Sequence, residues 1–171
     1  SGGSATSTTI NGGLQVVSSG GSATSTTINS DGWQNVSYDG SATSTTINSG
    51  GGQAVNSGGS ATSTTINSGG WQAVNSGGSA TSTTINGGRQ DVFSGGSATS
   101  TTINGGLQVV SSGGSATSTT INSGGQLSVF GGSAVDITQN SGGAIATDTS
   151  SDLSGTNAKG SFSIAGGSAN N

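Results

Sequence analysis

The sequence predicts an all-β solenoid, a parallel β-helix of about nine rungs with 18–19 residues each. The first observation is that Ser-Ala-Thr-Ser-Thr-Thr-Ile-Asn occurs seven times unchanged, at intervals of 18 or 19 residues. A fixed short period of this size is typical of solenoids. The second is that each unit alternates Thr-, Ile- and Val-rich segments with Asn-Ser-Gly-Gly segments, which favour strands and turns respectively. No segment has helical periodicity.

One unit, residues 60–78, shows the expected elements in order. We expect a first strand at 61–66, a first turn at 67–70, a second strand at 71–74 and a second turn at 75–78. Units that are one residue shorter lose that residue in a turn and never in a strand. Turns absorb such changes because stacking on neighbouring rungs fixes the register of the strands.

The second strand follows the pattern x-Gln-x-Val, in which the x positions accept almost any residue. We therefore expect the x positions to face solvent and the Gln and Val columns to face inward, an orientation supported by Leu127 at a Gln position. Buried amides need partners, so the Gln side chains should bond from rung to rung. The x columns begin at Leu14 and Val16.

The first strand is nearly invariant, and only the degenerate copy at 133–140 indicates its faces. There Ile137 replaces the second Thr and Asp136 replaces the middle Ser. The positions equivalent to Thr8 and Ile10 should therefore face inward and those equivalent to Ser7 outward. The positions equivalent to Ala5 should face inward if the strand bends after them.

Composition excludes several classes of function. Net charge is −4 with only two basic residues, so the chain offers no phosphate-binding surface for nucleic acid. Without Cys or His it has no thiol, imidazole or ordinary zinc chemistry. The six Asp residues are scattered, which argues against a carboxylate pair for glycoside hydrolysis and against a calcium β-roll. We predict a non-enzymatic protein with no catalytic residue, cofactor or metal site.

The recurring polar residues of the turns are the remaining candidates. The Asn after each Ile favours a ladder along one corner. Trp33, Trp71 and Tyr38 should be exposed, where they are either scattered surface aromatics or stack on sugars or on another rod. Small exposed serines flanked by Gly are accessible to a modifying enzyme, although the same serines suit turns for purely structural reasons. The candidate glycosylation residues are Ser19, Ser30, Ser49, Ser57, Ser68, Ser76, Ser94, Ser112 and Ser123.

Two other functions fit a β-solenoid. Rows of Thr6 and Thr8 equivalents would form an ice-binding array if both faced outward, although the copy with Val135 and Ile137 argues against this. A carbohydrate-active β-helix would need carboxylates close together on one face.

The repeat Ser-Gly-Gly-Ser-Ala-Thr-Ser-Thr-x-Ile-Asn-Ser-Gly-Gly-x-Gln-x-Val resembles that of self-associating autotransporter adhesins of the AIDA, antigen 43 and TibA type, most like the TibA type. The resemblance covers residues 1–147 and implies the β-helix region of a passenger domain with a right-handed β-helix. Residues 148–171 are expected to be irregular rungs or the start of another region.

For function, the resemblance implies secretion by the autotransporter route to the bacterial cell surface and outer membrane. It also implies autoaggregation through self-association, biofilm formation and adhesion to a host-cell surface receptor. A dedicated heptosyltransferase would O-heptosylate serines, which we assign to the turn serines given above.

Overall fold

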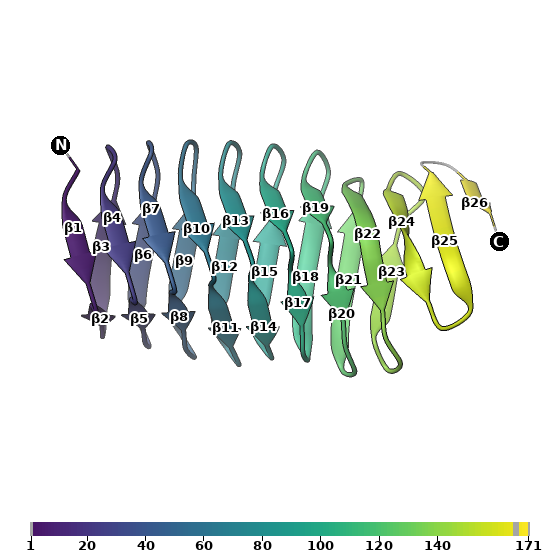
Figure 1. Cartoon of the computed structure of the whole chain (residues 1–171), viewed down its shortest axis with the longest axis horizontal. Helices are drawn as coiled ribbons and strands as arrows, with labels where there is room; N and C mark the ends of the chain where they lie inside the picture. Colours follow the sequence, from purple (N-terminus) through teal and green to yellow (C-terminus); the bar gives the residue numbers. More distant parts are fainter. Residues whose placement is uncertain (1, 166–167, 171) are drawn as a thin grey trace.

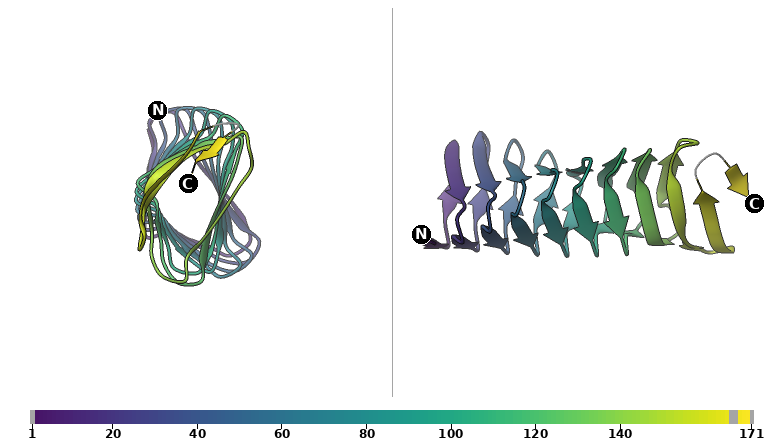
Figure 2. Two further views of the ribbon diagram at one scale, coloured as in Figure 1. Left: turned by 90° about the vertical axis from the view of Figure 1, so that its right-hand side faces the viewer. Right: turned by 90° about the horizontal axis from the view of Figure 1, so that it is seen from above.

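The computed structural model describes residues 2–165 and 168–170 as a rod of stacked rungs (Figure 1). The fold is all-β, a right-handed parallel β-helix. Seen along its axis, the chain winds around one flattened tube (Figure 2). We number the rungs 1 to 8 by their first residues, Ser4, Ser22, Ser41, Ser60, Ser79, Ser97, Ser115 and Ser133. The eighth is the last full turn, and an antiparallel hairpin follows where a ninth rung was expected.

Each of rungs 1 to 7 contributes three strands. The first column contains β1 (Ser4–Thr6), β4 (Ser22–Thr24), β7 (Ser41–Thr43), β10 (Ser60–Thr62), β13 (Ser79–Thr81), β16 (Ser97–Thr99) and β19 (Ser115–Thr117). The second contains β2 (Thr9–Ile10), β5 (Thr27–Ile28), β8 (Thr46–Ile47), β11 (Thr65–Asn67), β14 (Thr84–Asn86), β17 (Thr102–Ile103) and β20 (Thr120–Ile121). The third forms an eight-stranded sheet of β3 (Gly13–Val17), β6 (Gly32–Val36), β9 (Gly52–Val55), β12 (Trp71–Val74), β15 (Arg89–Val92), β18 (Gly106–Ser111), β21 (Gly125–Phe130) and β23 (Ala144–Thr147).

The expected first strand is in fact two strands separated by a corner. In rung 4, β10 ends at Thr62 and β11 begins at Thr65, because Ser63 adopts a left-handed backbone with φ of 56°. Its equivalents do the same in every rung, with φ between 55° and 57°. Only in rung 8 does one strand, β22 (Ser133–Gln139), continue through the corner, at Asp136. The prediction of one continuous strand at 61–66 was wrong, since Ser gives no sequence signal for this conformation.

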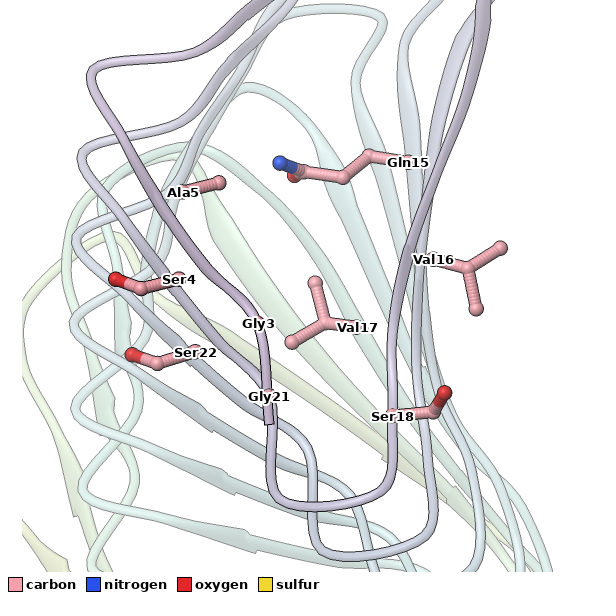
Figure 3. Close-up of a pocket in the computed structure, with 9 residues that line it drawn as sticks. All are labelled: Gly3, Ser4, Ala5, Gln15, Val16, Val17, Ser18, Gly21 and Ser22. Atoms are coloured by element: carbon pink, nitrogen blue, oxygen red, sulfur yellow. The ribbon is translucent and has the colours of Figure 1, made fainter. Parts of the chain in front are cut away.

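The inward columns match the predicted faces. The Ala, second-Thr and Ile positions are buried from rung 2 to rung 7, and the Ser63 equivalents are exposed. In the third column the Gln and Val side chains are buried. Figure 3 shows the arrangement at rung 1, where Ala5, Gln15 and Val17 point into the rod and Val16 points away. Each fully buried Ile or Val contributes about 1.5–3 kcal/mol.

The Gln side chains form one continuous ladder inside the rod. Each Nε2 donates to Oε1 of the Gln in the preceding rung, at 2.6–2.7 Å, from Gln15 to Gln108. The buried threonines complete the network. Gln53 Nε2 also donates to Thr45 Oγ1, and Thr45 Oγ1 donates to Gln34 Oε1, both at 3.3 Å. No buried side-chain N or O atom of the described residues lacks a partner.

The predicted Asn ladder follows one corner of the rod. Each Nδ2 donates to Oδ1 of the Asn before it, except between Asn67 and Asn86. There the turn of rung 5 is one residue shorter, and Asn67 instead forms a backbone bridge with Gly87. A second, shorter ladder joins Asn35, Asn56 and Asn75 at the other corner.

The x positions of the eight-stranded sheet are less exposed than predicted. Leu14 and Val16 are 63% and 58% exposed, but Ala73, Asp91 and Ser128 are at most 5% exposed. Two of these side chains are held by larger ones, because Trp71 and Arg89 donate hydrogen bonds to Asp91 and Gln126 donates one to Ser128. The prediction that every x position faces open solvent was therefore wrong in the middle of the rod.

The regular winding changes after rung 8. Strand β24 (Asp152–Asn157) still pairs in parallel with β22, but β25 (Gly160–Ala165) and β26 (Ser168–Asn170) follow in antiparallel order. A polar cluster holds the preceding loop. Asp148 Oδ1 accepts hydrogen bonds from Ser151 Oγ at 2.6 Å and from the backbone N–H of Gly131 at 3.2 Å.

The Gln ladder should make a large contribution to stability. Replacing Gln72 by Leu breaks two Gln–Gln bonds of 2.6 and 2.7 Å and one bond of 3.3 Å to Thr64 Oγ1. Gln108→Leu breaks one Gln–Gln bond, because Leu127 follows it, and two longer bonds, to Thr101 Oγ1 and from Thr119 Oγ1. We expect Gln72→Leu to lower the free energy of unfolding by about 3 kcal/mol, and Gln108→Leu to lower it by less, because the Gln–Gln bonds are the shortest of the network. Urea titrations followed by circular dichroism measure both. Equal losses in the two variants would contradict a ladder that acts through its Gln–Gln bonds.

The left-handed corner should be strained by its side chain. Ser63→Gly should raise the free energy of unfolding by about 1 kcal/mol, because Gly adopts positive φ without a Cβ penalty. The matched control is Ser68→Gly, because the φ angle of Ser68 is not positive. This substitution should lower the free energy of unfolding by a few tenths of a kcal/mol. Thermal unfolding compares the two, and a destabilised Ser63→Gly protein would show that the corner is not strained.

The Asp148 cluster should make stability depend on pH. The hydrogen bond from Ser151, supported by bonds from Ser150 and Gly131, lowers the pKa of Asp148 from its usual 3.8. The cluster therefore stabilises the fold above the unfolded-state pKa, and this contribution disappears as pH falls through the lowered folded-state pKa. Asp148→Asn should be less stable than wild type at pH 6, with the difference vanishing toward pH 2. Urea unfolding midpoints of both proteins between pH 6 and pH 2 test this prediction. A stability difference that does not change with pH would contradict the role of the Asp148 carboxylate.

Candidate functional site

The two turns of each rung form the two long edges of the eight-stranded sheet. Turn A precedes its strand and turn B follows it. In the turn A of rung 3, Gly51 N–H donates to Asn48 C=O at 2.9 Å and Gly50 has φ of 74°, as in a type II turn with Ser49 at its first central position. Turn B of the same rung has the same form, with Ser57 and Gly58 in the centre. Both turns thus place a serine at an edge.

In these turns a glycine follows the serine, except after Ser30, where Asp31 takes its place, and this glycine is required for two reasons. It has positive φ, and it lies directly against the serine of the preceding rung. A Cβ added to Gly69 would lie 2.6 Å from Ser49 Oγ, and one added to Gly95 would lie 2.7 Å from Ser76 Oγ. The hydroxyl groups of Ser49 and Ser76 therefore lie beside backbone that carries no side chain, which leaves them accessible to a modifying enzyme.

All nine predicted serines are exposed, and the structure arranges them in two rows. Ser30, Ser49, Ser68 and Ser123 lie on the turn A edge. Ser19, Ser57, Ser76, Ser94 and Ser112 lie on the turn B edge. Among these nine, only the Ser30 hydroxyl donates a hydrogen bond within the described residues, to Asp31 Oδ2 at 3.4 Å. The other eight hydroxyl groups have no protein partner there.

The rows have gaps where a turn departs from the repeat. Turn A of rungs 1, 5 and 6 is one residue shorter and has no serine. In turn B of rung 2, Tyr38 and Asp39 take the places of Ser and Gly and both have positive φ. Tyr38 is 71% exposed, as predicted. Ser19 also has positive φ, unlike the other eight serines.

Sequence reasoning missed two further sets of exposed serines. Ser141 occupies turn A of rung 8, where Gly143 N–H donates to Asn140 C=O, and the Asn-Ser-Gly-Gly motif is its sequence signal. The second set forms a third row at the left-handed corners between the first two strands. It consists of Ser7, Ser25, Ser44, Ser63, Ser82, Ser100 and Ser118. The outward direction of these serines was predicted, but their position at a left-handed corner between two strands was not.

The carboxylates do not converge on a reactive site. No group of three or more potential metal-ligating side chains occurs within the described residues. Asp91 has a basic partner at short range, with 2.8 Å between its Oδ2 and Arg89 Nε. No helix long and apolar enough to span a membrane occurs in this part of the chain.

Comparison with known proteins shows which family has this architecture. The model of a family described as adhesin of the bacterial autotransporter system, probable stalk, matches residues 38–88 and 85–125, together just over half of the chain. This chain belongs to the AIDA adhesin family. The prediction of an AIDA-type passenger is thereby confirmed. Among curated proteins, none matches.

A solved structure supports the same assignment. The crystal structure of a hyper-glycosylated TibA fragment, modified by TibC, matches with 56% sequence identity and a TM-score of 0.81. The match covers 84% of this chain and 55% of that one, so this chain spans little more than half of the TibA fragment.

Proposed function

We propose that this chain is part of the passenger of a bacterial surface adhesin and acts without enzymatic activity. It reaches the cell surface and outer membrane by the autotransporter route. It mediates autoaggregation, biofilm formation and adhesion to a host-cell surface receptor. A dedicated heptosyltransferase O-heptosylates its serine rows. Residues 1–147 are the repeat region, and 148–171 are irregular rungs or the start of another region.

One observation carries the proposal, namely the rows of exposed serines, of which all but Ser30 have a hydroxyl group without a protein partner among the described residues. A transferase needs an acceptor oxygen that it can reach and that no other bond occupies. The open backbone around Ser49 and Ser76 provides this at regular spacing. TibC glycosylates TibA, and the TibA fragment has 56% sequence identity to this chain, which supports the same kind of modification here.

Self-association follows from the same regularity. Rungs repeat about every 4.8 Å, so any contact made by one rung is offered again by the next. Two rods lying side by side add many weak contacts, and avidity makes the sum strong although each contact is weak. Heptoses on the turn A and turn B edges would alter which faces of two rods can contact each other.

The rival functions receive less support. An ice-binding array of Thr6 and Thr8 equivalents is not formed, because the Thr8 equivalents are buried from rung 2 to rung 7. For a carbohydrate-active enzyme, the carboxylates are too scattered to act as an acid and base pair.

Coexpression with a family heptosyltransferase tests the modification. We expect intact-mass spectra to show several additions of one heptose each. Three variants locate them: Ser→Ala throughout the turn A row (with Ser141), Ser→Ala throughout the turn B row, and Ser→Gly at the left-handed corners. We expect the two turn variants to carry fewer heptose additions than the unmodified sequence. An unchanged mass with active transferase would contradict the glycosylation, and loss confined to the corner variant would move the acceptors to the third row.

A further inference from the structure

We propose that the outer face of the eight-stranded sheet carries a binding site for a neutral saccharide, built around Trp33 and Trp71. The site adds a ligand class to the proposed adhesin function and rests on that function only for its biological setting.

The two tryptophans come together because Gly52 lies between them. Trp33, Gly52 and Trp71 are register partners on β6, β9 and β12. Positions two rungs apart are separated by roughly 9.6 Å along the rod, yet the indole centroids are only 5.4 Å apart, with an interplanar angle of 50°. A Cβ on Gly52 would lie 1.8 Å from Cζ3 of Trp33, so this ring lies over the bare backbone of Gly52. The predicted separate, exposed tryptophans are instead a partly buried pair.

The polar groups beside the pair hold it in place. Trp71 Nε1 donates a hydrogen bond of 2.7 Å to Asp91 Oδ2. Arg89 Nε donates to both oxygens of the same carboxylate, at 2.9 and 2.8 Å. Asp91 is only 5% exposed, so its position is fixed by packing as well as by these bonds. The indole plane of Trp71 is therefore preorganised, which lowers the entropy lost when a ligand binds.

The charges of the site favour a neutral ligand. Arg89 is the one cation beside the pair, and Asp91 balances it at 2.8 Å. The bond to Asp91 also raises the pKa of Arg89, which stays charged. No uncompensated cation remains within this cluster to attract an acidic group. Its surface combines aromatic rings with a few fixed polar groups, the usual composition of small-molecule sites.

Donors for sugar hydroxyl groups flank the rings on both sides. The Arg89 side chain is 51% exposed, and among the described residues it uses only Nε in hydrogen bonds. Its terminal nitrogens are therefore available as donors. Asn35, two residues from Trp33 on the same face, accepts from Asn56 through Oδ1 and keeps Nδ2 free to donate. A pyranose stacked on the indoles through its C–H groups would direct its hydroxyl oxygens to these donors.

Intrinsic fluorescence and titration calorimetry test the site. Trp33 and Trp71 are the only tryptophans, so fluorescence reports on the site alone. The probes are lactose, cellobiose and methyl α-mannoside, with 3′-sialyllactose as the acidic comparison. We expect saturable binding of at least one neutral probe, with Kd on the order of 1 mM.

Substitutions with residues native to the repeat separate binding from folding. Leu occupies the same column at Leu14 and Leu107, so Trp33→Leu and Trp71→Leu should fold normally and weaken binding at least about tenfold. Tyr38→Ser removes an exposed aromatic outside the pair and should leave Kd unchanged. Circular dichroism checks the fold of each variant.

Three results would overturn the proposal: no saturable response up to about 50-fold the expected Kd, equal Kd in Trp71→Leu, or tighter binding of sialyllactose than of lactose. None of these readouts depends on added heptose or on aggregation. A failed saccharide titration would therefore leave the adhesin function standing, and an unmodified, non-aggregating protein would leave this site standing if the titration succeeds.

Discussion

The interior ladder of Gln and Thr is the interaction on which the rest of the rod depends. A chain with only 26% apolar residues buries few hydrophobic groups per rung, so its interior must accommodate polar atoms. It does so by joining every Gln amide to the rungs on both sides and to buried threonines. These bonds form only when neighbouring rungs are in register, because a shift by one residue would turn the Gln outward. The ladder thus fixes the register as well as satisfying the core.

At the end of the ladder, the buried Gln and its Thr partner are both replaced by apolar residues. Leu127 replaces Gln in rung 7, and the next rung has Ile137 where the repeat has its buried Thr. Ile145 then takes the Gln position of rung 8, paired with Leu127. Both partners change together, so no amide or hydroxyl is left buried without a bond, and such a joint exchange is nearly neutral. The rod changes from a polar to an apolar interior just before its winding becomes irregular.

Much of this was predictable because the repeat contains its own substitutions. Leu127 and Ile137 revealed the inward faces, and the one-residue deletions located the turns. The left-handed corner at Ser63 was not predicted, since Ser is a poor marker of positive φ and only the degenerate copy has a residue that favours this conformation, Asp136. The modest exposure of Ala73 and Asp91 was also missed, because a pattern along one strand does not show how far side chains of neighbouring rungs extend. The Trp33–Trp71 pair was also missed. It becomes visible only when three rungs are aligned in register, because Gly52 between the two tryptophans has no side chain and leaves room for the Trp33 ring.

The invariant and variable positions therefore have different roles. The recurring residues build the interior columns of Ala, Thr, Ile, Gln and Val and most of the turns, and they place the serines of the turns and corners in rows. Variation is concentrated at the x positions of the eight-stranded sheet, where changing a side chain does not disturb the ladder behind it. That sheet lies between the turn A and turn B edges, so sugars on the serines would border it without covering its centre. A uniform scaffold can in this way carry a local site such as the tryptophan pair, because the outer face of this sheet accepts different side chains without a change in the core.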